Sequence, residues 1–325
     1  MVRTIRVHRV GGPECLSMDD TALPPPSRGE VQVQHTAIGV NFLDCYHRSG
    51  LYPLPALPHG VGGEAVGRVV AVGDGVHTIA IGERVAYGGH VPPGSYADAR
   101  NVPAWRLVPI PAGVEDTTIA ALLLKGLTAE FLVRRVTKVG RGHHVLVHAA
   151  AGGVGLLLCQ WLRHVGATVY GVVSTPEKAE VARAHGCHQV IVRSEENVVD
   201  VVQRMTQGKG LDVVYDSVGK STLRESLQCL KKRGLLVAFG NSSGRPDPVA
   251  ITELQAGSFY LTRPTLHDYT STREELLHAA QVLFELVAGG VLRARIDSTL
   301  PLAEAAAAHR RLESRQSTGA IVLVP

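Results

Sequence analysis

The sequence predicts an α/β fold that combines a doubly wound parallel sheet with a mostly β unit. Residues from about 123 to 265 alternate apolar runs typical of buried strands with helical patterns, as parallel sheets covered by helices do. Residues 1–122 instead carry short β-branched runs between glycine- and proline-rich turns. Residues 266–325 contain two helical stretches and a final apolar run, which predicts a terminal strand at 320–324.

The elements at the two ends of the chain are short or widely spaced. In the first region the clearest strands are predicted at 31–34 and 68–72, because both are rich in valine, which favours extended backbone. Turns are predicted where proline and glycine gather, at 24–26, 73–75 and 92–94. In the last region, the spacing of apolar residues predicts helices over 272–288 and 302–314.

The middle region is predicted to hold buried strands separated by helices, at 144–148, 168–173, 190–192, 211–215 and 234–240. The first helix has an apolar face made by residues at helical spacing: Val154, Leu157, Leu158, Trp161, Leu162 and Val165. Gly166 is well placed to end this helix and Pro176 to open the next. Strands and helices that alternate in this order form a doubly wound sheet.

The loop after the first of these strands has a phosphate-binding pattern. Residues 150–155 align with G-x-G-x-x-G, so Gly152 lets the backbone approach a pyrophosphate and Gly155 allows close contact between helix and strand. Ala150 replaces the first glycine, so we expect the turn to be made without a positive φ at that residue. The helix that begins here directs free N–H groups and its positive dipole end at the phosphates. This context favours a Rossmann-type dinucleotide site over a structural turn.

The end of the second strand predicts which nicotinamide cofactor is bound. An acidic residue about 20 residues after the glycine loop would hydrogen-bond the ribose 2′-hydroxyl of NAD, but Ser174 stands there. Lys178, one turn into the next helix, and Arg193, after the third strand, could approach the same place. A hydroxyl and two cations suit a 2′-phosphate, which a carboxylate would repel. We therefore predict NADPH; the alternative is that Lys178 and Arg193 are ordinary surface charges.

Composition argues against several classes of protein. The formal net charge of +4 on 325 residues is not gathered into a basic run, so charge does not suggest binding to nucleic acid or an anionic membrane. No apolar run could span a bilayer and the N-terminus shows no secretion signal, so we expect a cytoplasmic protein. The 5 cysteines lie far apart without a C-x-x-C pair, which argues against a disulfide framework and a structural zinc cluster.

Residues 142–163 match the pattern G-H-x-x-L-x-x-x-A-A-G-G-x-G-x-x-x-x-Q-x-x-R. Through this signature the chain resembles the zinc-independent quinone oxidoreductases of the medium-chain dehydrogenase/reductase superfamily, and most closely the bacterial NADPH:quinone reductases related to ζ-crystallin. The resemblance covers most of the chain and includes the segments 41–44, 48–53, 125–128, 215–219, 239–244, 262–264 and 313–315.

The resemblance implies how the chain is organised. A GroES-like catalytic domain would combine residues 1–122 with the returning segment 266–325, a Rossmann NADPH-binding domain would span 123–265, and a cleft would join them, usually in a homodimer. Asn41 and Thr128 would lie beside the nicotinamide. Other residues would line the cofactor: Gly153, Val154, Ser174, Lys178, Phe239, Asn241, Ser242 and Arg315. Close relatives have tyrosine in place of Arg193, and we interpret this arginine as a charged partner of the 2′-phosphate.

The zinc ligands of the related alcohol dehydrogenases are missing. Those enzymes hold zinc through a cysteine near residue 40 and through the histidine of a Gly-His-Glu sequence, where this chain has Gly63. The four-cysteine structural lobe is also absent. Three other candidates lack the spacing of a known site: Cys45, His47 and His59. We therefore predict no metal and interpret Glu64, which remains from that sequence, as a structural hydrogen-bond acceptor.

Without a metal to polarise an alcohol, such an enzyme suits acceptors that are already electrophilic, such as quinones. The cofactor supplies the hydride and the protein aligns donor and acceptor. Negative charge on the acceptor oxygen then needs a hydrogen-bond donor. Tyr46 and Tyr52 are the candidates, with Asn41 as an amide alternative, although each tyrosine could equally be packed with its hydroxyl in water. No general acid is evident, so solvent could supply the proton.

Two other functions stay open. The same scaffold suits an NADPH-dependent enal or enone reductase, because the fold does not choose between these acceptors. Relatives serve as lens crystallins or contact AU-rich RNA. The lack of a basic stripe and an aromatic content of 5% give an RNA-binding or crystallin-like role little support.

Overall fold

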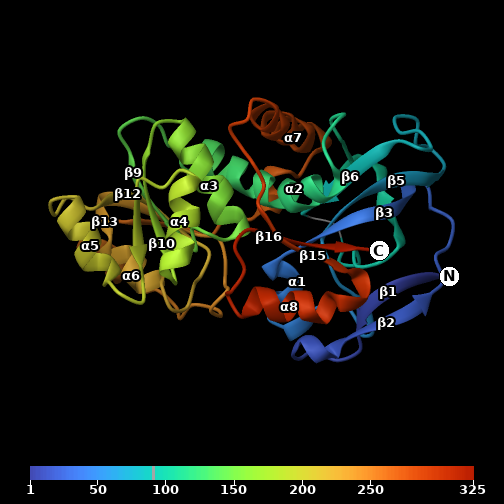
Figure 1. The fold of residues 1–325 in the computed structure, drawn as a ribbon, viewed down its shortest axis with the longest axis horizontal. Coiled ribbons are helices and arrows are strands. Elements are labelled where there is room, and N and C mark those ends of the chain that lie inside the picture. The colour runs from blue at the N-terminus through green and yellow to red at the C-terminus, as the bar shows by residue number, and fades with distance from the viewer. Residues whose placement is uncertain (90–91) are drawn as a thin grey trace. The chain divides into compact units, whose positions relative to one another are not determined.

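A computed structural model describes residues 1–89 and 92–325 (Figure 1). The chain divides into two compact units, and both chain ends belong to the first. That unit consists of Met1–Leu127, Tyr269–Phe284 and Ala294–Pro325, and the second consists of Thr128–Asp268 and Glu285–Arg293. These divisions lie a few residues from the predicted ones, and a short segment of the C-terminal region is grouped with the second unit.

The second unit contains a six-stranded parallel sheet in the order β11–β10–β9–β12–β13–β14. Its strands are β9 (His144–His148), β10 (Thr168–Val173), β11 (Gln189–Val192), β12 (Leu211–Asp216), β13 (Leu230–Ala238) and β14 (Tyr260–Thr262). In chain order this is 3-2-1-4-5-6, the order of dinucleotide-binding folds, which confirms the predicted fold class. β14 was not predicted, because three residues are too few to show a period.

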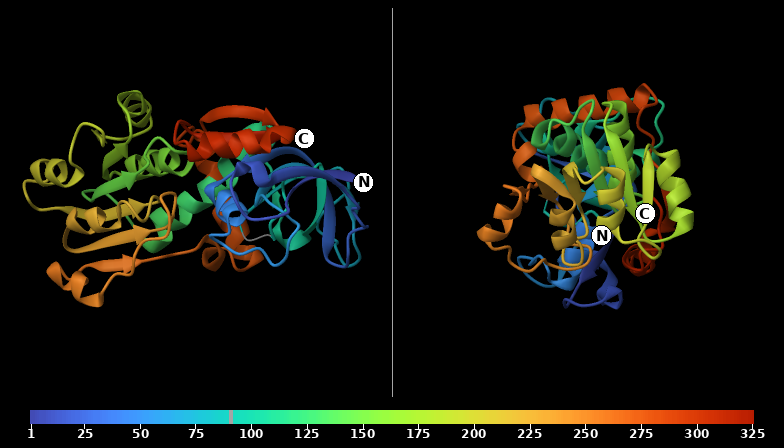
Figure 2. Two further views of the ribbon diagram at one scale, coloured as in Figure 1. Left: turned by 90° about the horizontal axis from the view of Figure 1, so that it is seen from below. Right: turned by 90° about the vertical axis from the view of Figure 1, so that its left-hand side faces the viewer.

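Helices lie on both faces of this sheet (Figure 2). α3 (Gly153–His164) packs against β9 and β10, and α4 (Pro176–Ala184) packs against β10 and β11. α5 (Val198–Met205) packs against α6 (Leu223–Gln228), which covers β12 and β13. Gly166 has a φ of +86° directly after α3, and Pro176 is the first residue of α4, so both predicted helix signals are confirmed.

The first unit is built on two sheets. A seven-stranded sheet runs β15–β16–β3–β5–β6–β8 with β7 also paired to β3, and a three-stranded sheet runs β2–β1–β4. The strands are β1 (Val2–Val7), β2 (Leu16–Thr21), β3 (Glu30–Val40), β4 (His59–Gly60), β5 (Glu64–Val72), β6 (Arg84–Gly88), β7 (Ala99–Pro103), β8 (Val108–Pro109), β15 (Ile296–Pro301) and β16 (Ala320–Val324). The predicted strands at 31–34 and 68–72 lie inside β3 and β5, and the predicted terminal strand is β16.

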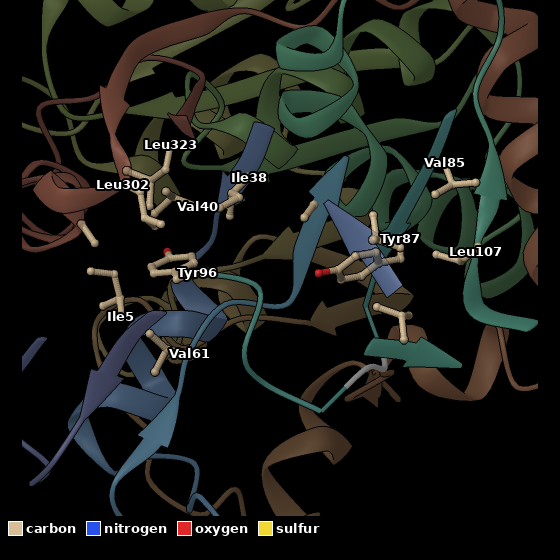
Figure 3. Close-up of a cluster of buried hydrophobic side chains, with 14 of the residues drawn as sticks. Ile5, Ile38, Val40, Val61, Val85, Tyr87, Tyr96, Leu107, Leu302 and Leu323 are labelled. Carbon is tan, nitrogen blue, oxygen red and sulfur yellow. The ribbon is translucent and has the colours of Figure 1, made fainter. Parts of the chain in front are cut away.

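The first unit also holds α1 (Phe42–Ser49), α8 (Ala305–Glu313) and most of α2 (Asp116–Glu130) and α7 (Arg273–Ala288). The chain also has short 3₁₀ helices, η1 (Pro13–Cys15), η2 (Ala104–Arg106), η4 (Ile251–Ala256), η5 (Leu266–Tyr269) and η6 (Leu302–Glu304), and a π-helix, η3 (Phe131–Val136), directly after α2. The buried core draws on both chain ends, because Ile38 and Tyr96 cluster with Leu302 and Leu323 (Figure 3). Within the described part of the chain, no helix is long and apolar enough to cross a membrane.

Candidate cofactor and active site

The loop between β9 and α3 makes the turn that a phosphate site requires. The left-handed residue is Ala149, with a φ of +51°, so the turn avoids a positive φ at Ala150, as expected. The amide of Gly152 donates to the carbonyl of Ala149 over 2.9 Å, which closes the turn before α3 begins. A Cβ at Gly155 would come far inside contact distance of the Ala149 carbonyl oxygen and within 2.9 Å of the Cα of Ala150. Only glycine therefore lets α3 approach the strand this closely.

The first N–H groups of α3 have no partner within the helix, because they precede its first hydrogen-bonded turn. Together with the helix dipole they favour an anion at this end. The loop is thus a phosphate cradle, in which backbone N–H groups rather than side chains would bind an anion. It suits the pyrophosphate of a dinucleotide.

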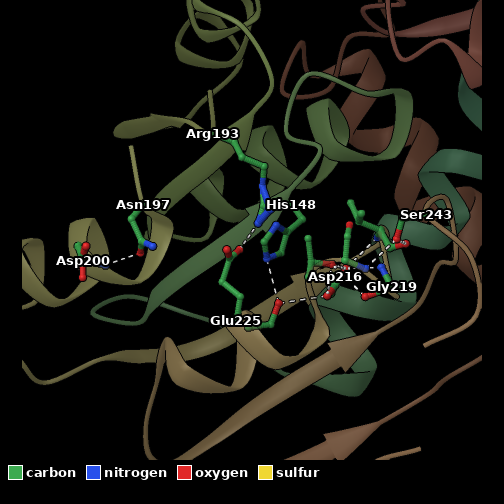
Figure 4. A network of polar contacts seen from close by, with 12 residues as sticks. His148, Arg193, Asn197, Asp200, Asp216, Gly219, Glu225 and Ser243 are labelled. Atoms are coloured by element: carbon green, nitrogen blue, oxygen red, sulfur yellow. Dashed lines mark hydrogen bonds and ion pairs between the residues drawn. The ribbon is translucent and has the colours of Figure 1, made fainter. Parts of the chain in front are cut away.

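Ser174, Lys178 and Arg193 lie at the same edge of the sheet. Ser174 follows β10 and is exposed. The amide of Arg193 donates to the carbonyl of Val173, the residue before Ser174, over 2.9 Å. Lys178 lies in the first turn of α4, where its amide donates to the hydroxyl of Thr175. The guanidinium of Arg193 is ion-paired with Glu225 of α6 (Figure 4). Glu225 was not predicted as a partner of Arg193, since residues 32 positions apart carry no local signal of their contact.

A buried carboxylate shapes the loop after β12. Asp216 accepts hydrogen bonds from the amides of Val218 and Gly219 over 2.8 and 3.0 Å, and from the hydroxyls of Thr222 and Ser226 (Figure 4). The Ser226 hydroxyl also lies 2.9 Å from Nε2 of His148, the last residue of β9. Burial lowers the pKa of His148 and favours its neutral form. This network ties the loop of β12 to the strand that precedes the glycine loop.

Phe239, Asn241 and Ser242 follow β13 at the same edge. The amide of Phe239 donates to the carbonyl of Asp216 over 2.8 Å, and the amide of Ser242 donates to that of Ser217. The structure therefore gathers the predicted cofactor residues of the second unit at the carboxyl ends of β9, β10, β11 and β13, where doubly wound sheets bind ligands. Arg315 instead follows α8 in the first unit, with a φ of +59°, and Thr128 lies in α2 at the start of the second.

In the first unit, two buried carboxylates hold Asn41 at the start of α1. Its amide N–H donates to Oδ2 of Asp44 over 2.8 Å, and its side-chain Nδ2 donates to Oε2 of Glu64 over 2.9 Å and to the carbonyl of Gly39. Glu64 also accepts from the amide of Leu124 over 2.7 Å and from Nζ of Lys125 over 3.3 Å. Glu64 is thus the predicted structural acceptor, whereas the roles of Asp44 and Lys125 were missed.

Tyr46 and Tyr52 form a pair. Their ring centroids lie 5.2 Å apart at an angle of 60°, and the amide of Tyr52 donates to the carbonyl of Tyr46 over 3.0 Å. Both side chains are half-buried. The structure therefore brings these two predicted residues together, beside the helix that starts at Asn41.

Gly63, at the histidine position of the zinc enzymes, faces Asp44. A Cβ at this glycine would lie 4.0 Å from Oδ1 of Asp44. Cys45 is buried with its sulfur 3.5 Å from Nδ1 of His309, and His59 bonds the carbonyl of Gly60. Over residues 1–89 and 92–325, no three His, Cys, Asp or Glu residues are grouped so that they could hold a metal ion.

Two family descriptions match the chain. An alcohol dehydrogenase GroES-like domain matches residues 27–112, and a zinc-binding dehydrogenase domain matches residues 153–285. Full-length relatives include a 2-haloacrylate reductase of Burkholderia, 45% identical over 100% of this chain and 99% of that protein, and a quinone oxidoreductase of Pseudomonas aeruginosa, 46% identical over all of both chains.

Among solved structures, the quinone oxidoreductase of Escherichia coli complexed with NADPH is similar over 100% of both chains, with a TM-score of 0.97 and 44% identity. These matches agree with the fold, the glycine loop and the sequence signature, and they confirm the resemblance. The chain belongs to the zinc-independent quinone oxidoreductase family of the medium-chain dehydrogenase/reductase superfamily.

Proposed function

We propose that this protein reduces quinones with NADPH, by hydride transfer from the nicotinamide to the acceptor. The observation that carries the proposal is the phosphate cradle of α3 beside Ser174, in a chain 44% identical over its full length to a quinone oxidoreductase complexed with NADPH. Consumption of NADPH in the presence of 1,4-benzoquinone tests it. No turnover above the rate without enzyme would refute it.

The cofactor is held mainly by the second unit in this proposal. The backbone from Gly152 to Gly155 faces the pyrophosphate, and Ser174 with Lys178 faces the 2′-phosphate. The remaining contacts come from Phe239, Asn241, Ser242 and Arg315. The Kd of NADPH against that of NADH measures the preference, and equal values would contradict it.

In this proposal the guanidinium of Arg193 leaves Glu225 and binds the 2′-phosphate of NADPH. Its ion pair with Glu225 compensates its charge, and the pair is partly exposed, with side-chain exposures of 36% and 25%. Ion pairs at this level of exposure contribute about 0–1 kcal/mol, so a phosphate can compete for the guanidinium. Glu225→Gln should therefore tighten NADPH binding and Arg193→Ala should weaken it, with NADH binding unchanged in both. Equal effects on both cofactors would remove Arg193 from the site.

At the reacting end, when NADPH is bound it supplies the hydride, and the protein must stabilise the negative charge that develops on the acceptor oxygen. Both N–H groups of the Asn41 side chain are already donated to Glu64 and Gly39. In this proposal the hydroxyls of Tyr46 and Tyr52 are the donors to the acceptor oxygen, and Asn41 and Thr128 position the nicotinamide. Tyr46→Phe and Tyr52→Phe should each lower kcat/KM; a tyrosine whose replacement has no effect is not a donor.

Reduction of an activated alkene is the second candidate. A 2-haloacrylate carries a carbon–carbon double bond polarised by its carboxylate, and a reductase of this substrate is 45% identical over the full chain. The same hydride step serves both acceptors. A panel of quinones, enones and 2-haloacrylates, compared by kcat/KM with NADPH, decides which class is preferred.

We also propose a cytoplasmic homodimer. Among residues 1–89 and 92–325, β14 pairs with β13 alone and so ends the parallel sheet, and apolar side chains are exposed beside it: Tyr260 at 61% and Ile251 at 86%. Such an edge is suited to pairing with a second copy. Light scattering after size-exclusion chromatography should give twice the chain mass, and Tyr260→Asp should give the monomer. Cell fractionation tests the location.

A further inference from the structure

Asp44 is a buried carboxyl group whose two oxygens have different surroundings. The side chain is 1% exposed. Oδ2 accepts two hydrogen bonds, from the amide of Asn41 over 2.8 Å and from the hydroxyl of Tyr96 over 2.9 Å. Oδ1 accepts none from any described residue. Since Oδ2 faces two donors, a proton on this carboxyl group belongs on Oδ1.

His309 determines the direction in which the Tyr96 hydroxyl donates its hydrogen. Nδ1 of His309 faces the donors Arg48, at 3.3 Å, and Cys45, at 3.5 Å. Nδ1 is therefore the acceptor, and Nε2 carries the hydrogen toward the Tyr96 oxygen at 3.1 Å. Burial lowers the pKa of His309 to about 3, which keeps the ring neutral. The hydroxyl hydrogen of Tyr96 is thus left to point at Asp44.

The charges around Asp44 allow it to take up and release a proton near neutral pH. Burial raises its pKa from 3.8 to about 7, against the lowering effects of the Asn41 amide, Tyr96 and Lys125, while Glu64 raises it further. The other ionisable groups of this cluster are Cys45, His309 and the ion pair of Arg48 with Glu313, whose oxygen lies 2.6 Å from the guanidinium.

Gly63 leaves space next to the oxygen that would carry the proton. A Cβ at this position would lie 4.0 Å from Oδ1 of Asp44, 3.8 Å from the carbonyl oxygen of Gly89 and 4.0 Å from a methyl carbon of Leu43. These are ordinary contact distances, so an alanine can be accommodated. Asn41, which positions the nicotinamide in the proposed function, donates its amide N–H to the other oxygen of the same carboxyl group.

We propose that Asp44 is the general acid of this enzyme and donates the proton on Oδ1 to the oxygen of the acceptor. The inference rests on the proposed function. The acceptor gains a hydride, with its electron pair, from the nicotinamide and a proton from Asp44. The O–H bond of Asp44 breaks, the quinone becomes a hydroquinone, and the carboxylate regains a proton from water before the next turnover.

The test is the pH dependence of kcat with NADPH and 1,4-benzoquinone. A general acid must be protonated, so kcat of the wild type should be constant at low pH and fall tenfold per pH unit above about 7. Asp44→Asn keeps an acceptor for the Asn41 amide and removes the proton. It should lower kcat at pH 6 by about a hundredfold, abolish this pH dependence and leave the Kd of NADPH unchanged.

Two variants separate acid catalysis from a structural role. Tyr96→Phe removes a hydrogen bond that stabilises the carboxylate, so the fall in kcat should move to higher pH. Gly63→Ala places a methyl group against Oδ1 and should lower kcat with the pH dependence retained. Asp20 is an exposed carboxylate on β2, so Asp20→Asn is the control for loss of one negative charge. Its kcat and pH dependence should match those of the wild type.

If Asp44→Asn keeps the wild-type pH dependence, or Tyr96→Phe does not shift it, the inference is overturned while the proposed function stands. If the wild type does not turn over at all, the proposed function fails and the inference fails with it.

Discussion

Replacing Glu64 by glutamine removes the buried carboxylate that joins β5 to α1 and α2. Its side chain is fully buried, and Lys125, 3.3 Å away, is only 6% exposed. Oε2 accepts from Asn41 and Lys125, and Oε1 accepts from the amide of Leu124. Glutamine offers one acceptor oxygen and one NH2 group. In either orientation its NH2 group would therefore face a donor, either the Leu124 amide or the side chains of Asn41 and Lys125. The buried ammonium of Lys125 also loses its counter-charge.

Breaking one partner of a buried ion pair costs about 3–5 kcal/mol. With a urea dependence of about 2 kcal/mol per M, the midpoint of unfolding should fall by about 2 M. The chain has 2 tryptophans, Trp105 in the first unit and Trp161 in the second. In a Trp161→Phe background, fluorescence of Trp105 therefore reports on the unit that contains Glu64.

A double-mutant cycle isolates the pair. Lys125→Met removes the ammonium and keeps an apolar stem, so the combination of Glu64→Gln with Lys125→Met should cost less than the sum of the two single changes. A loss below about 1 kcal/mol for Glu64→Gln, or strict additivity in the cycle, would refute the argument that this carboxylate is held as a buried ion pair.

Three further outcomes are expected. Ser174→Asp places a carboxylate where the 2′-phosphate is proposed to lie, so the Kd of NADPH should rise about tenfold or more, about 1.4 kcal/mol, while NADH binding does not weaken; isothermal titration measures both. Gly155→Ala forces a methyl group against the turn at Ala149 and should weaken binding of either cofactor, whereas Gly140→Ala, which meets nothing within 4 Å, should match the wild type. The pKa of Asp44 is raised to about 7 by burial, so the folded state binds a proton that the unfolded chain releases near pH 4. The stability of the first unit should therefore fall as pH rises from about 4 to about 7, and Asp44→Asn should remove that slope in urea unfolding followed through Trp105.

The sequence by itself determined the elements whose signals are local. β9 and β10 occupy the predicted residues, because buried parallel strands are continuous apolar runs bounded by turn residues. The glycine loop was predicted before a helix, and the close approach of that helix to the strand requires glycine at position 155. The signature at residues 142–163 predicted the family, and identity of 44–46% over the full chain to quinone oxidoreductases confirmed it.

The tertiary structure alone decided which polar groups meet. Ala149 takes the left-handed conformation next to the position where a glycine is usual, because the strand, loop and helix must close on one another. Arg193 pairs with Glu225, Glu64 with Lys125, and Tyr96 links Asp44 to His309. These partners are 32 to 213 positions apart. The periodic patterns of strands and helices, with periods of two and 3.6 residues, cannot predict these contacts. Burial and charge compensation bring such residues together only once the chain has folded.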